Sequence, residues 1–214
     1  MNPSPQRYST VAILLHWAIA ALILYNIWLG WRYSGDKSAV GLLKHAPLIG
    51  DALAKVPTKG LAQYNVLQLH KSVGITVLGL TLVRFAWRLV KRPPEEVPGM
   101  PAWQQVAAKI THWGFYAILI GLPLTGWIMV SASTTNIPTV LFKHIPFPHL
   151  GFIHDMARDS RKAIDGTTTD LHYRLVNLTY VLLVLHVGAA LQHQFIKRDG
   201  VLWRMLPLPA LRPR

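Results

Sequence analysis

Four long apolar segments constrain the fold of this chain more than any other feature. They cover residues 11–31, 66–90, 106–130 and 173–196. Each has about the 20 residues that an α-helix needs to cross a hydrocarbon core of about 30 Å. Of the 214 residues, 51% are hydrophobic and only 14% are charged, which is too apolar for a soluble domain of this size. The sequence therefore predicts an all-α, integral membrane four-helix bundle that forms a single domain over residues 1–214.

The first apolar segment is interpreted as a retained span, not as a signal peptide. It is longer than the roughly 7 to 15 apolar residues of a signal-peptide core, and no small-residue cleavage site follows before Trp31. The chain has no cysteine, which excludes disulfides, iron–sulfur ligation by thiolates and covalent c-type haem. Any redox cofactor must therefore be held by other ligands.

The net charge of +13 is distributed unevenly along the chain. Lysine and arginine are denser in the N-terminus, in the link between the second and third spans and in the C-terminal tail than in loops 32–65 and 131–171. Because basic residues concentrate in cytoplasmic loops, we expect both termini in the cytoplasm and the two long loops outside. This topology accounts for the charge, so membrane lipid and not nucleic acid is the expected partner.

The connecting segments differ in kind. Residues 91–103 form a short link that its prolines keep extended, and Gly121, Pro123 and Gly126 are expected to break the third span. Residues 152–164 have apolar side chains at helical spacing, which predicts either an amphipathic helix on the outer membrane surface or an ordinary packed loop helix. Residues 37–56 have a similar but interrupted pattern.

Histidines recur on one face of the fourth span. His172 and His186 differ by about 40° around the helix axis and by about 21 Å along it. His193 follows seven residues after His186, on the same face and near the cytoplasmic end. With both termini inside, His16 lies at the depth of His186, and His70 at the depth of His172.

Three helices thus supply two histidine pairs at two depths. Ionisable residues inside a membrane usually face the bundle interior and mark a functional path. Two opposed neutral imidazoles are the ligand set that a bis-histidine haem iron requires. Such an iron has no free coordination position, and it transfers electrons instead of binding dioxygen.

Neighbouring residues add detail to this site. Arg84 lies on the same helix face as His70 and at the depth of the inner pair, His16 and His186. There it either pairs with a haem propionate or snorkels to the cytoplasmic interface. His112, beside Trp113, is interpreted as a membrane-interface residue without a ligand role. The remaining histidines lie in the outer loops and are expected to be solvated, with surface metal binding as the alternative; they are His45, His144, His149 and His154.

Six motifs together resemble the bacterial cytochrome b561 family of four-helix, di-haem membrane cytochromes. They are STVAILLHW, LQLHKSVG, LVRFAWRL, HWGFYAILIGLPLTGWIM, LHYRL and LHVGAALQHQFIKRDGVLWRMLP. The resemblance covers all four spans, whereas the first and third loops match poorly. It implies a protein of the bacterial inner membrane with two haem b groups, one held by His16 and His186 and the other by His70 and His172.

The resemblance also implies a function. A characterised family member is a superoxide oxidase, which passes electrons from superoxide at the outer face through both haems to ubiquinone. His193 matches the position implicated there in the quinone site, although it could instead cap the end of its helix. The family often has two adjacent histidines here, whereas this chain has Gln194. The long outer loops also depart from that member.

Three functions remain open at this point. The first is a superoxide:ubiquinone oxidoreductase, and the second is a cytochrome b subunit that serves a periplasmic redox protein. Outer-loop cations would attract either superoxide or an acidic partner protein. The third is a metal or proton transporter lined by histidines, although the spans contain no aspartate or glutamate.

Overall fold

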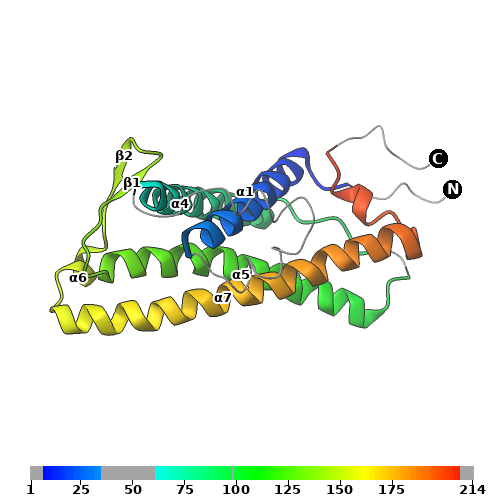
Figure 1. Cartoon of the computed structure of the whole chain (residues 1–214). Coiled ribbons are helices and arrows are strands. Elements are labelled where there is room, and N and C mark those ends of the chain that lie inside the picture. Colours follow the sequence, from blue (N-terminus) through cyan, green and yellow to red (C-terminus); the bar gives the residue numbers. More distant parts are fainter. Residues whose placement is uncertain (1–6, 35–60, 98, 208–214) are drawn as a thin grey trace, which may run out of the picture. The chain divides into compact units, whose positions relative to one another are not determined.

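Four long helices dominate the computed structural model, which describes residues 7–34, 61–97 and 99–207 (Figure 1). They are α1 (Thr10–Ser34), α4 (Leu61–Val90), α5 (Ala102–Ala132) and α7 (Arg158–Gln192). All four are long and apolar enough to cross a membrane. The predicted all-α class with four membrane spans is confirmed.

The spans keep large apolar side chains on their surfaces. Leu24, Val83, Ile110 and Val184 lie on different helices, and each is more than half exposed. A water-soluble protein rarely leaves so many apolar side chains uncovered on every helix. Lipid acyl chains are therefore the natural solvent for these helices.

The fourth helix is longer than the sequence predicts. Its 35 residues span about 52 Å at 1.5 Å per residue, whereas a hydrocarbon core needs only about 30 Å. The predicted separate helix at 152–164 is wrong, because α6 covers only Gly151–His154 and α7 already begins at Arg158.

Local chemistry explains why α7 starts so early. The charged residues in its first turns lower the hydropathy but are compatible with a helix. A single glycine in a helix interior costs only about 1 kcal/mol, so it does not end the helix either. The hydroxyls of Thr167 and Thr168 donate to the carbonyl oxygens of Ala163 and Ile164, at 3.0 and 2.7 Å. These threonines therefore form bonds that are compatible with the helix.

The third span is continuous, so the expected break at Gly121, Pro123 and Gly126 is also wrong. Pro123 lies inside α5. A Cβ atom at Gly121 would lie 3.5 Å from Leu175 Cδ1, and one at Gly114 would lie 3.3 Å from Leu182 Cδ1. The glycines therefore permit close packing of α5 against α7, as small residues do in membrane bundles.

The connections between the helices are of three kinds. Residues 35–60, which contain most of the first loop, His45 and the pattern at 37–56, lie outside the described residues. The described residues of the link after α4, 91–97 and 99–101, form no helix or strand, as predicted. In the third loop, β1 (Thr139–Leu141) and β2 (Ile145–Phe147) form an antiparallel hairpin, which the sequence analysis did not predict.

Contacts gather in two compact units, and each long helix contributes to both. The first unit is Met1–Ile19, Leu78–Thr125 and Thr169–Arg214, and the second is Ala20–Val77 and Gly126–Thr168. The buried apolar side chains of the first unit are Ile13, Ile19, Tyr116, Ile118 and Leu119, and those of the second are Leu29, Val73, Val77, Ala132 and Ile153.

Candidate haem and quinone sites

Two of the predicted ligands lie close together in the first unit. His16 lies on α1 and His186 on α7, and their ring centroids are 6.1 Å apart. A bond between a metal and an imidazole nitrogen is about 2.0 Å long. Since that nitrogen lies about 1.1 Å from the ring centre, two imidazoles on opposite sides of one iron have centroids about 6.2 Å apart. The spacing of His16 and His186 therefore fits a haem iron held between them.

A third imidazole, that of His112, lies beside His186. The His112 ring on α5 has its centroid 6.0 Å from that of His186, and the Phe115 ring is 5.3 Å from His186. The interpretation of His112 as a residue of the membrane interface is therefore wrong. Helical spacing could have placed His112 toward the other helices, because His112 lies four residues before the buried Tyr116 and shares its helix face.

Two arginines bring positive charge to this site. The Arg84 guanidinium lies 5.8 Å from the centroid of the Tyr116 ring, and the Arg88 guanidinium lies 5.8 Å from Trp113 and 5.9 Å from Tyr116. Arg84 is also close enough to act electrostatically on His16, His112 and His186. No acidic side chain forms a salt bridge with either arginine in the described part of the chain. Haem propionates are anions of the kind that such cations require within a membrane.

His172, on α7 in the first unit, has a hydrogen-bond partner that favours one tautomer. Thr125 Oγ1 lies 2.8 Å from the Leu122 carbonyl oxygen, to which its hydroxyl donates. His172 Nδ1 lies 2.9 Å from Thr125 Oγ1, and with the hydroxyl proton directed at Leu122 it is Nδ1 that donates. Nε2 is then the unprotonated nitrogen, as an iron ligand requires.

His70, on α4 in the second unit, is fixed in the same way. Its Nδ1 lies 3.1 Å from the carbonyl oxygen of Asn26, and a carbonyl can only accept. Nδ1 therefore carries the proton, and Nε2 is the unprotonated nitrogen. A Cβ atom at Gly30 would lie 3.4 Å from His70 Cε1, so this glycine gives the imidazole its space.

The β-hairpin is bound to the same stretch of α4. Gln68 donates to the Pro138 carbonyl oxygen at 2.6 Å and accepts the Val140 N–H at 3.0 Å. Ser72 Oγ accepts the Phe142 N–H at 2.9 Å. Hydrogen bonds from the hairpin therefore reach α4 two residues before and two residues after His70.

The second unit contains a buried cation that the sequence analysis had counted as a loop residue. Arg32, in the last turn of α1, is only 6% exposed, and its guanidinium lies 5.4 Å from the centroid of the Trp28 ring. Its Nε has no hydrogen-bond partner among the described residues. A buried guanidinium with an unused donor suits an anionic group such as a propionate.

The third-loop histidines are only partly solvated. His144 is exposed, whereas His149 and His154 are half-buried, with ring centroids 5.0 Å apart. Burial lowers the pKa of His149, whose Nε2 has no hydrogen-bond partner within the described ranges. The expectation of full solvation is therefore wrong for His149.

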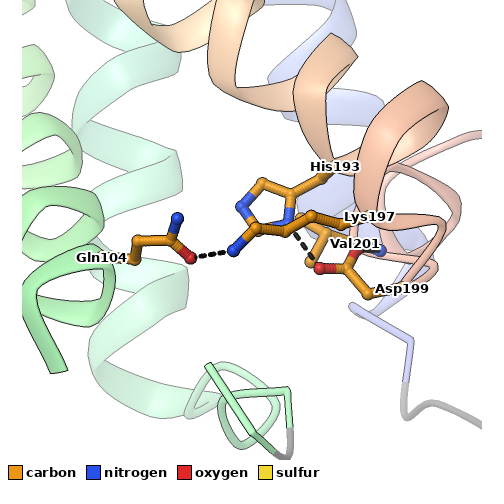
Figure 2. A network of polar contacts seen from close by, with 5 residues as sticks. All are labelled: Gln104, His193, Lys197, Asp199 and Val201. Carbon is orange, nitrogen blue, oxygen red and sulfur yellow. Dashed lines mark hydrogen bonds and ion pairs between the residues drawn. The ribbon is translucent and has the colours of Figure 1, made fainter. Parts of the chain in front are cut away.

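His193 begins a short π-helix (His193–Lys197) that follows α7, and it is 9% exposed. Figure 2 shows its ring directed at Asp199, whose Oδ2 lies 2.5 Å from His193 Nδ1. Asp199 Oδ1 also accepts the Val201 N–H at 3.2 Å, which anchors the carboxylate. Nearby, Lys197 donates to Gln104 of α5. The His193 ring is thus bonded to a carboxylate and not to a helix-end carbonyl.

A sequence profile described as prokaryotic cytochrome b561 matches residues 7–208. The chain belongs to the prokaryotic cytochrome b561 family. Cytochrome b561 homolog 2 of Escherichia coli (strain K12) is 26% identical over 207 residues, which cover 95% of this chain and 93% of the relative. Cytochrome b561 homolog 1 of the same organism is 30% identical over 150 residues, which cover 70% of this chain and 80% of the relative.

A third relative bears the name of an activity. The probable superoxide oxidase CybB of Yersinia pestis is 26% identical over 202 residues, which cover 94% of this chain and 97% of the relative. As a cytochrome b561, the chain is a membrane electron carrier that binds haem b, and two bis-histidine haems are typical of its family. The family favours the redox interpretation over a histidine-lined transporter.

Proposed function

We propose that this cytochrome b561 carries electrons from a donor outside the cell membrane to ubiquinone. His16 and His186 hold one haem b, and His70 and His172 hold the other. The whole chain forms one domain of the bacterial inner membrane, with both termini in the cytoplasm.

One observation carries this proposal: the centroids of the His16 and His186 rings are 6.1 Å apart, a spacing at which both can bind one iron. The hydrogen bonds to His70 and His172 support it, because each leaves Nε2 as the unprotonated nitrogen. When bound, each haem b takes up and releases one electron at an iron without a free coordination position. Arg84 and Arg88 balance the propionate charge of the haem that His16 and His186 hold.

Haem content tests the ligand set. Each of His16→Ala, His186→Ala, His70→Ala and His172→Ala should lower the haem content of the purified protein from two per chain to about one. His112→Ala is the matched control, since His112 lies as close to His186 as His16 does, and it should retain both haems. If His112→Ala loses a haem while His16→Ala keeps both, the inner pair is His112 and His186.

At the cytoplasmic end, His193 supplies a proton to ubiquinone. Asp199 accepts a hydrogen bond from Nδ1–H, so Nε2 is the nitrogen left to relay a proton: it takes one up from the cytoplasmic side and passes it to the reduced quinone oxygen. The carboxylate holds the ring in one orientation. The burial of His193 supports this role, because a solvated histidine would not define a site.

Reoxidation kinetics test the quinone site. In His193→Gln, chemically reduced protein mixed with a short-chain ubiquinone should be reoxidised at least tenfold more slowly, with an unchanged haem spectrum. Gln192→Ala, one residue earlier, is the control and should react at the wild-type rate. Equal reoxidation rates in His193→Gln and wild type would remove His193 from the proposal.

Superoxide is the first candidate donor, because one relative is named a probable superoxide oxidase. Exposed cations at the start of α7 and on the hairpin support it, since positive charge attracts a small anion. They are Lys143, Arg158 and Lys162. Rapid haem reduction by enzymatically generated superoxide, slowed by added salt, is the expected result.

A periplasmic redox protein is the second candidate donor, because the same unit exposes apolar side chains. Phe142 and Ile145 on the hairpin are 48% and 58% exposed, and Phe152 on α6 is 71% exposed. Such residues outside the spans suit a protein contact. Phe142→Ser with Ile145→Ser should slow reduction by a protein donor and leave reduction by superoxide unchanged.

A further inference from the structure

A basic cavity of about 310 Å³ opens in the first unit, beside the start of α1 and the end of α4. Its wall includes three cationic side chains and no acidic one. The residues that carry the argument are Arg7, Tyr8, Ser9, Ala12, Lys91 and Arg92. Neither the ligand set nor the quinone site uses any of them.

Arg7 carries an unused donor at this cavity. One of its terminal nitrogens donates to the Leu206 carbonyl oxygen. Its Nε is buried and has no hydrogen-bond partner within residues 7–34, 61–97 and 99–207. A buried, charged donor without an acceptor is unfavourable, so an anionic ligand would complete its bonding.

The first turn of α1 adds further positive potential. Ser9 caps the helix, with its Oγ accepting the Ala12 N–H at 3.3 Å and the Trp87 Nε1–H at 2.9 Å. Other amides of the first turn have no acceptor within the helix, and the macrodipole favours an anion there. The 25-residue length of α1 makes this dipole fully developed.

Tyr8 contributes a neutral donor. Burial raises the pKa of its phenol, so the hydroxyl stays protonated. Arg84, Arg88 and Arg204 act electrostatically on Tyr8 together with one acid, Glu96, so cations are in excess around it.

The position of the cavity selects the kind of anion. Lys91 and Arg92 follow directly on the last residues of the α4 span, and Leu89 and Val90 there are 66% and 74% exposed. A ligand whose phosphate lies among the cations can therefore lay acyl chains along these side chains. We propose that this cavity binds the phosphodiester group of an anionic phospholipid.

Lipid retention tests the proposal on the full-length, haem-loaded protein. The protein is equilibrated in detergent with equal amounts of phosphatidylglycerol and phosphatidylcholine, and native mass spectrometry counts the lipids that stay bound. Wild type should retain phosphatidylglycerol at least fivefold over phosphatidylcholine. Equal retention of the two lipids by wild type would overturn the proposal without any variant.

A charge-matched pair of variants locates the site. Lys91→Gln with Arg92→Gln should lose the fivefold preference, whereas Lys109→Gln with Arg174→Gln should keep it, because both of those exposed cations lie outside the cavity. An unchanged haem spectrum checks folding. Equal phosphatidylglycerol retention by the two double variants would contradict the assignment.

Inorganic phosphate separates a lipid from a soluble ligand. At millimolar concentration it should displace little phosphatidylglycerol, because it has no acyl chains to contact Leu89 and Val90. Complete displacement would show a site for free phosphate and overturn the lipid assignment.

Discussion

The hydroxyl of Thr125 determines which nitrogen of His172 can bind iron, so Thr125→Val is a sharp test of the proposed ligand. Valine keeps the shape of threonine and removes the hydroxyl, whose oxygen lies 2.9 Å from His172 Nδ1 and which also donates to the Leu122 carbonyl oxygen. The imidazole then either loses the Thr125 acceptor of its Nδ1–H or moves the proton to Nε2. Both outcomes weaken the bond to iron.

The size of the effect follows from the lost hydrogen bond. A buried donor left without its acceptor costs about 1–3 kcal/mol. At about 1.4 kcal/mol per factor of ten, the affinity for one haem should fall by about 5- to 150-fold. This agrees with the loss of about 10–100-fold that usually follows removal of an outer partner of a metal-bound histidine.

Haem transfer to an excess of apoglobin measures this change. One of the two haems of Thr125→Val should dissociate faster than in wild type, and the other should dissociate at the wild-type rate. Thr179→Val is the matched control, because Thr179 also donates to a helix carbonyl on α7, that of Leu175, at 2.8 Å. Unchanged release from Thr125→Val, or equally fast release from the control, would refute the reasoning.

Two further substitutions test neighbouring parts of the sites. Gly30→Val should crowd the His70 ring, so the protein should lose one haem and keep the other. Gly79→Val is the control and should keep both haems, because a Cβ atom placed there meets no neighbouring side chain within 4 Å. Asp199→Asn removes a charge-assisted bond worth about 1.5–3 kcal/mol, so ubiquinone should reoxidise the reduced protein about 10–100-fold more slowly. Glu95→Gln, a nearby exposed acid, should keep the wild-type rate, and haem content should be normal in both variants of this pair.

The spans were predictable because a membrane imposes simple requirements. A chain in lipid must satisfy its backbone internally, so length and hydropathy are enough to identify the helices. The start of α7 at Arg158 was not predictable in this way. Beyond the hydrocarbon core, a charged helix and a polar loop have similar hydropathy.

The predicted orientation of the spans placed His16 and His186 at one depth, and their ring centroids are 6.1 Å apart in the structure. Periodicity does not determine how far each helix is rotated toward its neighbours. The approach of His112 to His186, and the bond between Thr125 and His172, depend on that rotation. Asp199 reaches His193 only because a π-helix and an αL residue, Arg198, follow α7.

The hairpin bonds around His70 have a mechanical consequence. Gln68 and Ser72 attach β1 and the hairpin turn to the face of α4 roughly opposite His70, so a force on the hairpin would be transmitted to the turn of α4 that carries this proposed ligand. A protein that docks on the hairpin and displaces it would tilt the imidazole without touching the cofactor. The geometry of the iron, and with it the reduction potential, would then respond to the arrival of the donor itself.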